Sequence, residues 1–319
     1  MLNRRILRIK VFKTLYSSEL KGNSSLAEAE AQLEASCEAT RDLYLFMLGT
    51  VSPLTKIAAD RIDAARRKFN PTEEEKNPNT KFADNALAKL LDADPDFVKL
   101  FRKKKFSWEQ YDLVLKKIFN SIVTKDYYAA YMQSPESSLK DDCRLFIRIF
   151  EEEFVGSSEL EAVLEGMSIY WGEDLPYALT YVCRTLDNLG KGGRWTLPPL
   201  YLSETRQGPD IEDDRLFARN LLRAGYLNYG KYYDMVAGSV SNWDNDRIVS
   251  TDMCIIILGM AEAVAFPTIP VKVTINEYVE ISKFFGTPKS KIFVNGILDR
   301  LIQKMSQDGM IVKSGKGLL

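Results

Sequence analysis

The sequence contains no histidine among its 319 residues and only four cysteines. Without histidine the chain lacks the commonest general base, the commonest metal ligand and any Ser or Cys nucleophile that a histidine activates. The cysteines show no CxxC or other ligand spacing, so we expect reduced thiols and no zinc. These absences favour a protein that is not an enzyme and has no cofactor, although carboxylate, lysine or tyrosine catalysis stays open.

A strong charge of either sign is also missing, because 43 Lys and Arg face 44 Asp and Glu, a net charge of -1. This balance excludes a globally polybasic nucleic-acid binder, so any RNA-binding surface must be local. The apolar run from Ile248 to Ala265 approaches membrane-span length, but Asp252 and Glu262 lie inside it and indicate a buried core helix. No signal peptide pattern is present. We therefore expect a cytoplasmic protein without a membrane partner.

Helical periodicity dominates the chain, and no alternating strand pattern extends beyond a few residues. The sequence therefore predicts an all-α fold. Gly49 and Pro53 should break the longest predicted helix. The predicted helices cover 3–20, 26–68, 83–92, 95–103, 108–120, 124–132, 138–154, 157–170, 174–189, 211–224, 228–240, 246–265, 274–285 and 290–307.

The C-terminal helices carry the clearest local signals. Thr274 and Glu277 have the spacing of a capping box, which would start a helix that carries Tyr278, Ile281, Phe284 and Phe285 inward. The next helix has an apolar stripe of Phe293, Ile297, Leu301 and Met305. An internal echo is also present: residues 144–148 resemble 215–219, and each is followed by a Trp-x-x-Asp, Trp171 to Asp174 and Trp243 to Asp246. Coincidence and a degenerate duplication both explain this echo.

Four motifs in order resemble the transcription antitermination factor NusB family. They are the opening Arg4-Arg5-Ile6-Leu7-Arg8 helix running into Leu15-Tyr16, the Asn242–Ile248 segment with the apolar helix after it, Ile269-Pro270-Val271-Lys272-Val273-Thr274-Ile275-Asn276-Glu277, and Phe293-Val294-Asn295-Gly296-Ile297-Leu298-Asp299. The resemblance implies two small helical bundles packed together, here with a large extra helical insertion. An elongated form of this kind is associated with Bacteroidetes-like bacteria.

The resemblance divides the chain into four parts. Residues 1–20 form the basic N-terminal helix of the NusB-like core, 21–209 an inserted helical region, 210–308 the C-terminal core and 309–319 a tail. From its lysines and glycines we expect this tail to fray. Two positions depart from the family pattern. Ile256-Ile257 replaces a Leu-Arg pair, which removes a polar contact, and Lys289 stands where compact members tend to carry an acid. The second change suits phosphate binding.

The N-terminal cations are the first candidate RNA-binding residues. Five cations precede the first acid, Glu19, and Arg4 and Arg8 lie one helical turn apart. From the residues alone, a solvated basic helix end is a better explanation of these cations than RNA binding. The family resemblance makes RNA binding the better explanation. The full candidate RNA-binding set is Arg4, Arg5, Arg8, Lys13, Tyr16, Lys289, Ser290, Lys291 and Phe293. Its aromatic members would stack on bases or, on the plainer interpretation, pack in the core.

A second basic cluster, Arg102-Lys103-Lys104-Lys105 followed by Phe106 and Trp108, lies in the insertion. The family resemblance gives no guidance there, and a solvated turn and an auxiliary RNA contact both stay open. The resemblance also implies a protein partner, with Asp252 and Glu262 as the acidic residues that contact it; a buried or capping role is the alternative for both. Gly190–Arg194 lacks the spacing of a phosphate loop.

The resemblance implies a binding protein that pairs with ribosomal protein NusE on single-stranded boxA-like RNA and joins the RNA polymerase antitermination complex. Such a complex suppresses premature termination in ribosomal RNA operons. Two alternatives remain: a subunit of an RNA-modifying enzyme, and a protein scaffold without RNA binding. The first is disfavoured because RNA cytosine methyltransferases with a NusB-like domain carry a Pro-Cys nucleophile, and this sequence has no such dipeptide. The sequence leaves the role of 21–209, the oligomeric state and the RNA preference open.

Overall fold

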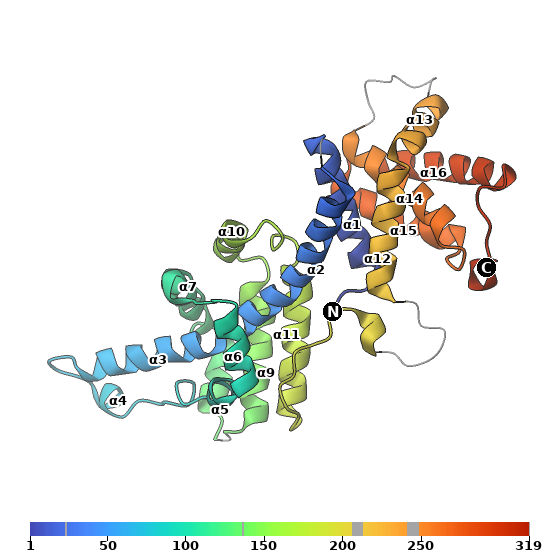
Figure 1. The fold of residues 1–319 in the computed structure, drawn as a ribbon. Helices are drawn as coiled ribbons and strands as arrows, with labels where there is room; N and C mark the ends of the chain where they lie inside the picture. The colour runs from blue at the N-terminus through green and yellow to red at the C-terminus, as the bar shows by residue number, and fades with distance from the viewer. Residues whose placement is uncertain (23, 136, 206–212, 241–248, 319) are drawn as a thin grey trace. The chain divides into compact units, whose positions relative to one another are not determined.

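The fold is all-α in the computed structural model, which describes residues 1–22, 24–135, 137–205, 213–240 and 249–318 (Figure 1). Within these ranges no strand forms, and the one extended contact is an isolated parallel bridge between Leu2 and Tyr201. No helix in the described part is long and apolar enough to cross a membrane. The predicted fold class is therefore confirmed.

The chain divides into two compact units. Unit 1 contains Glu38–Pro199 together with Met1, and unit 2 contains Leu2–Cys37 and Leu200–Leu319. The helix α2, Leu26–Leu48, contributes its first half to unit 2 and its second half to unit 1. Helix α2 ends before Gly49 and α3 begins at Val51, so the break predicted near Gly49 and Pro53 is present.

Unit 1 surrounds an aromatic core. Helices α9 and α11 pack side by side, and α3 packs against α5 and α7 (Figure 1). The indole of Trp108 stacks on Phe46 with 4.1 Å between ring centroids and donates its N–H to the Phe46 carbonyl at 2.9 Å. After the second half of α2, its helices are α3 Val51–Arg66, α4 Glu73–Lys76, α5 Ala86–Ala93, α6 Pro95–Lys103, η1 Glu109–Tyr111, α7 Asp112–Ile122, α8 Asp126–Gln133, α9 Leu139–Ile149, the π-helical η2 Phe150–Phe154, α10 Ser158–Met167 and α11 Leu175–Gly190.

Unit 2 is organised around α14, which contacts α1, α12, α13, α15 and α16. Every residue of α14 from Asp252 to Ala263 is buried, as its apolar circumference predicts. Gly259 lets α16 approach closely, since a Cβ there would lie 2.7 Å from Leu298. The helices of unit 2 are α1 Arg4–Lys21, the first half of α2, η3 Leu202–Thr205, α12 Asp214–Leu227, α13 Tyr229–Ser239, α14 Ser250–Ala265, α15 Val271–Phe285, α16 Ser290–Gln307 and η5 Gly315–Leu318.

The compact units are divided at other residues than the parts expected from the sequence. Residues 24–37 and 200–205 lie in unit 2, whereas the sequence placed them in the inserted region. Ion pairs hold the first half of α2 to α12: Glu30 binds Arg219 and Arg223, and Glu34 binds Arg215. These partners are about 190 residues apart in sequence, so unit 2 is assembled from both ends of the chain.

Two further local predictions are wrong. Helix α15 begins at Val271, one turn before Thr274, whose buried hydroxyl donates to Glu262 at 2.9 Å instead of capping the helix. The C-terminal tail, expected to fray, packs back on unit 2: Ile311 is buried and the Lys313 ammonium donates to the Phe266 carbonyl at 3.0 Å. The Asn242–Ile248 motif and the Trp243–Asp246 half of the echo lie outside the described residues.

Candidate nucleic-acid interface

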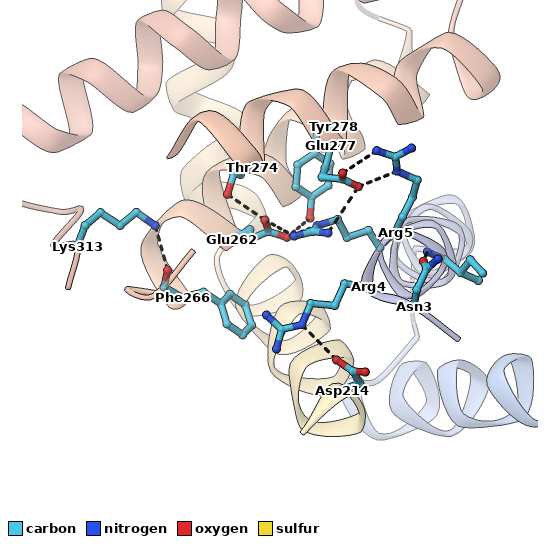
Figure 2. Close-up of polar contacts among 12 residues, drawn as sticks. Asn3, Arg4, Arg5, Asp214, Glu262, Phe266, Thr274, Glu277, Tyr278 and Lys313 are labelled. Atoms are coloured by element: carbon cyan, nitrogen blue, oxygen red, sulfur yellow. Dashed lines mark hydrogen bonds and ion pairs between the residues drawn. The ribbon is translucent and has the colours of Figure 1, made fainter. Parts of the chain in front are cut away.

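A buried ion pair joins the opening helix to the central helix. Arg8 on α1 donates two hydrogen bonds to Glu262 on α14, at 2.7 and 2.9 Å, and their side chains are 4% and 0% exposed. Glu262 also accepts the hydroxyls of Thr274 and Tyr278 from α15 (Figure 2). Burial alone would lower the pKa of Arg8, but Glu262 outweighs it and the net shift is upward. Burial, reinforced by the carboxylate, raises the pKa of Tyr278 far above its ordinary range.

The two preceding arginines are more exposed, yet each also has a carboxylate partner. Arg5 forms two hydrogen bonds with Glu277, at 2.9 and 2.7 Å, and Arg4 donates to Asp214 at 3.2 Å (Figure 2). The Arg4 guanidinium also lies over the Phe217 ring. The bonds from Arg5 hold the pKa of Glu277 below its ordinary value.

These pairs show that the arginines of the N-terminal run do not form an uncompensated positive field. The run is acid-free in sequence, but the fold brings Asp214, Glu262 and Glu277 to it from distant segments. Arg8 is a structural residue in this conformation, because a buried side chain with two bonds to a carboxylate has no access to RNA. Arg4 and Arg5 remain accessible but partly neutralised.

A second part of the interface is the corner where α15 ends and α16 begins. Ser290, the first residue of α16, is buried; it donates to Asp252 at 2.6 Å and accepts the backbone N–H of Thr287 at 2.7 Å. Gly286 lies so close to Ser290 that a Cβ would fall 2.4 Å from its side chain. These contacts fix the corner on α14. Burial raises the pKa of Asp252, and its second oxygen has no hydrogen-bond partner among the described residues.

The second half of α1 packs against this corner. The Phe12 and Phe285 rings lie 5.2 Å apart, and the Lys13 ammonium lies 5.5 Å over the Phe285 ring. Tyr16 is half-buried and accepts a hydrogen bond from Ser250, the first residue of α14, at 3.4 Å. The fold therefore brings Lys13 and Tyr16 to the same region of unit 2 as the start of α16.

The corner presents both cations and apolar groups to solvent. Lys289 and Lys291 are exposed and Phe293 is half-buried. Phe284 and Ile292 are each 78% exposed, although the sequence placed Phe284 inward. Phe285, seven residues after the buried Tyr278, lies on the inward face of α15, whereas Phe284 is turned about 100° from it, toward solvent. Sequence reasoning missed both residues; the available signal was that Ile292 falls outside the apolar stripe of its helix.

The structure thus brings together Lys13, Tyr16, Lys289, Lys291 and Phe293 from the predicted RNA-binding set and removes Arg8 and Ser290 from its surface. It also places both residues of the predicted partner contact in the interior of unit 2. Asp252 and Glu262 are both buried and bonded to residues of their own unit, which is the alternative role considered for them. A protein partner cannot reach either carboxylate in this conformation.

The described residues offer no metal centre, because none of their His, Cys, Asp and Glu side chains form a group of three or more that could hold an ion. The cysteines do not form disulfides, and Cys37, Cys143 and Cys254 are buried. Burial raises the pKa of the Cys254 thiol to about 11, which disfavours the reactive thiolate. The arrangement is suited to binding through cations and rings.

Comparison with known proteins gives one consistent family. A model described as the NusB family matches residues 198–303. The transcription antitermination protein NusB of Geobacter sulfurreducens is 35% identical over 113 residues, which are 35% of this chain and 81% of the relative. The NusB proteins of Salinibacter ruber and Chloroherpeton thalassium are 30% and 38% identical over 105 and 84 residues, which are 33% and 26% of this chain.

The limited extent of these matches restricts which properties of the relatives can be assigned to this chain. The chain covers 66% of the Salinibacter relative and 40% of the Chloroherpeton relative, less than two thirds of either. The matched family segment lies in unit 2, apart from residues 198 and 199 at the end of unit 1. No solved structure gives a significant match to the chain.

Proposed function

The chain belongs to the NusB family, and on that premise we propose that it is a transcription antitermination factor that binds boxA-like single-stranded RNA together with ribosomal protein NusE. Its action is binding, with no catalytic step. We place it in the cytoplasm, in the complex that joins elongating RNA polymerase and suppresses premature termination of ribosomal RNA operons.

The observation that carries this proposal is the α1–α15–α16 corner, which we define as Lys13, Tyr16, Phe284, Lys289, Lys291, Ile292 and Phe293. Single-stranded RNA is held by cations along its phosphates and by rings on which bases stack. The corner supplies both within one unit, through Lys13, Lys289 and Lys291 and through Tyr16, Phe284 and Phe293. Its backbone is fixed by the Ser290–Asp252 contact, so little ordering is needed on binding.

The start of α16 adds an electrostatic contribution. Lys289 precedes the helix and Lys291 lies in its first turn, where no acidic side chain is present. Backbone amides at a helix N-terminus and the helix dipole both favour a phosphate. Phosphate contacts would position the RNA, while the rings and neighbouring polar groups would select unstacked bases.

NusE is the proposed protein partner, and its contact must lie outside the buried Asp252 and Glu262. Two ligands on one protein are coupled reciprocally: RNA must tighten NusE by the same factor by which NusE tightens RNA. We expect a coupling of about 1–3 kcal/mol, typical of such systems. Equal RNA affinity with and without saturating NusE would remove the cooperative part of this proposal.

The corner is tested by titrating a boxA-like RNA at several salt concentrations with the variant Lys289→Gln/Lys291→Gln. Losing two phosphate contacts should weaken binding and flatten the logarithmic salt dependence by about 1.4, since single strands release about 0.7 counterions per contact. The matched control is Lys231→Gln/Lys304→Gln, which removes two exposed unit 2 cations away from the corner, one on α13 and one in the last turn of α16. Equal losses in both variants would mean that only net charge matters and that the corner is not the binding site.

A further inference from the structure

Unit 1 carries a basic surface that differs from the N-terminal one. We define the α6 basic turn as Lys99, Arg102, Lys103 and Lys105, at the end of α6 and just beyond it. All four side chains are exposed, and none of them forms an ion pair with any residue in the described part of the chain. From Phe97 to Trp108 the sequence has five cations and no acid. The fifth, Lys104, pairs with Asp42 at 2.6 Å.

The backbone of this turn is firmly held. Lys99, Arg102 and Lys103 have the i, i+3, i+4 spacing that puts side chains on one helix face. On the other face, Phe97 is buried and Phe101 packs against Gly49, where a Cβ would lie 2.3 Å from its ring. The cations are therefore mounted on an anchored helix.

Lys105 stands in a conformation that usually belongs to glycine. Its φ is 55°, and it is the only residue other than glycine with positive φ in the described ranges. The Lys105 N–H donates to the Arg102 carbonyl at 2.9 Å and the Phe106 N–H to the Phe101 carbonyl at 3.3 Å, the bonds of a Schellman motif. Favourable charge at a helix C-terminus explains Arg102 and Lys103. It does not explain a lysine kept in a strained position where glycine fits better.

A hollow next to the turn favours RNA over an acidic protein as the ligand. Its volume is about 850 Å³, in the size range of small-molecule sites, and Arg102, Phe101, Phe106 and Trp108 are among its lining residues. Asp60, Asp92, Glu109 and Asp112 also line it. These carboxylates can accept hydrogen bonds from the amino groups of an unpaired base, while the cations of the turn would contact its phosphates.

We propose that the α6 basic turn and its hollow form a second RNA-binding site, which takes single-stranded RNA beyond the segment bound by unit 2. This proposal rests on the proposed function, because it assigns the insertion a share of the same RNA. Two linked contacts on one ligand raise the overall affinity without any new contact at the first site. The site therefore extends the length of RNA that the protein holds.

The test uses the full chain, a short boxA-like RNA and the same RNA extended at both ends. The variant Lys99→Gln/Arg102→Gln/Lys103→Gln/Lys105→Gln should bind the extended RNA on the order of tenfold more weakly, with a salt dependence flattened by up to about 2.8. Its binding of the short RNA should not change. The matched control, Lys68→Gln/Lys76→Gln/Lys89→Gln/Lys117→Gln, removes four unit 1 lysines that already have carboxylate partners. It should leave both affinities unchanged.

The outcomes separate this proposal from the function proposed for unit 2. If the quadruple variant of the α6 basic turn binds the extended RNA as tightly as the wild type, the proposal of a second site is wrong and the unit 2 proposal is unaffected. If Lys289→Gln/Lys291→Gln has no effect while the quadruple variant binds both the short and the extended RNA more weakly, unit 1 binds RNA and the assignment of RNA binding to unit 2 is wrong. Lys105→Gly gives a further check: it should melt at the same or a higher temperature yet bind the extended RNA more weakly. Wild-type binding by this glycine variant would contradict a role for Lys105.

Discussion

Two basic segments with similar sequences have opposite surroundings in this protein. Arg4, Arg5 and Arg8 each meet a carboxylate from a distant segment, whereas Lys99, Arg102, Lys103 and Lys105 have no ionic partner in the described part of the chain. Neither segment contains an acid within its own length, from Met1 to Ser18 or from Phe97 to Trp108. The difference shows that a local run of cations predicts a positive surface only if the fold brings no acid to it. In unit 2 these three arginines form ion pairs that stabilise the helical core. The exposed Lys289 and Lys291 of the corner remain available to bind a ligand.

The contrast between the two basic segments predicts the largest loss of stability at Arg8. Arg8→Ala would leave Glu262 buried and without its cation, so the free energy of unfolding should fall by about 3–5 kcal/mol. Chemical denaturation of the full chain measures this loss, provided that the transition of unit 2 is followed separately. A loss below about 1 kcal/mol, the range of exposed ion pairs, would mean that water reaches the pair and that Arg8 is available to RNA.

A smaller effect is expected at Arg5, whose pair with Glu277 is more exposed. Arg5→Ala should cost about 0.2–1 kcal/mol. Because the folded pKa of Glu277 is lowered, the pair contributes stability above the ordinary pKa of 4.5 and loses it as the pH falls through the folded value. The variant should therefore lose less stability than the wild type on acidification.

Melting curves between neutral and acidic pH check this pH dependence. Lys283→Ala is the matched control, because Lys283 pairs with Glu280 on the same helix and leaves Glu277 untouched. If Arg5→Ala and the wild type lose stability in parallel as the pH falls, the Arg5–Glu277 pair is not the source of the pKa shift.

The smallest effect on stability is expected at the α6 basic turn. Replacing its four cations with glutamine should change the free energy of unfolding by no more than about 0.5 kcal/mol, because the lost attraction of Arg102 and Lys103 to the helix C-terminus is offset by relief of the repulsion among the four like charges. A loss of several kcal/mol would show that these cations have structural partners, and the contrast between the two basic segments would disappear.

The fold class followed from periodicity because each helix repeats its own local pattern. The break after α2, the buried α14 and the stop after it were all predicted from a few residues each. Local periodicity could not predict contacts between residues that are far apart in the sequence. Arg8 and Glu262 are 254 residues apart, so no local signal shows that their charges cancel. The unit boundary in the middle of α2 depends on ion pairs with α12 that are equally distant in sequence.

The candidate site was predicted in part for the same reason. Residue type and the family resemblance selected Lys13, Tyr16, Lys289, Lys291 and Phe293, which the fold does bring to one region of unit 2. They could not separate exposed from buried members. Ser290 is buried where it donates a hydrogen bond to Asp252, and Phe284 turns outward because Phe285 shares the inward face with Tyr278.

The central claim, that RNA binds at the α1–α15–α16 corner, is tested most directly by ultraviolet cross-linking. The full chain is cross-linked to a boxA-like RNA and the attached peptides are identified. Stacked rings lie in van der Waals contact with bases, so we predict cross-links at Tyr16 and at Phe293, with Phe284 as a third position. Cross-links to unit 2 that avoid both α1 and the start of α16 would contradict the account.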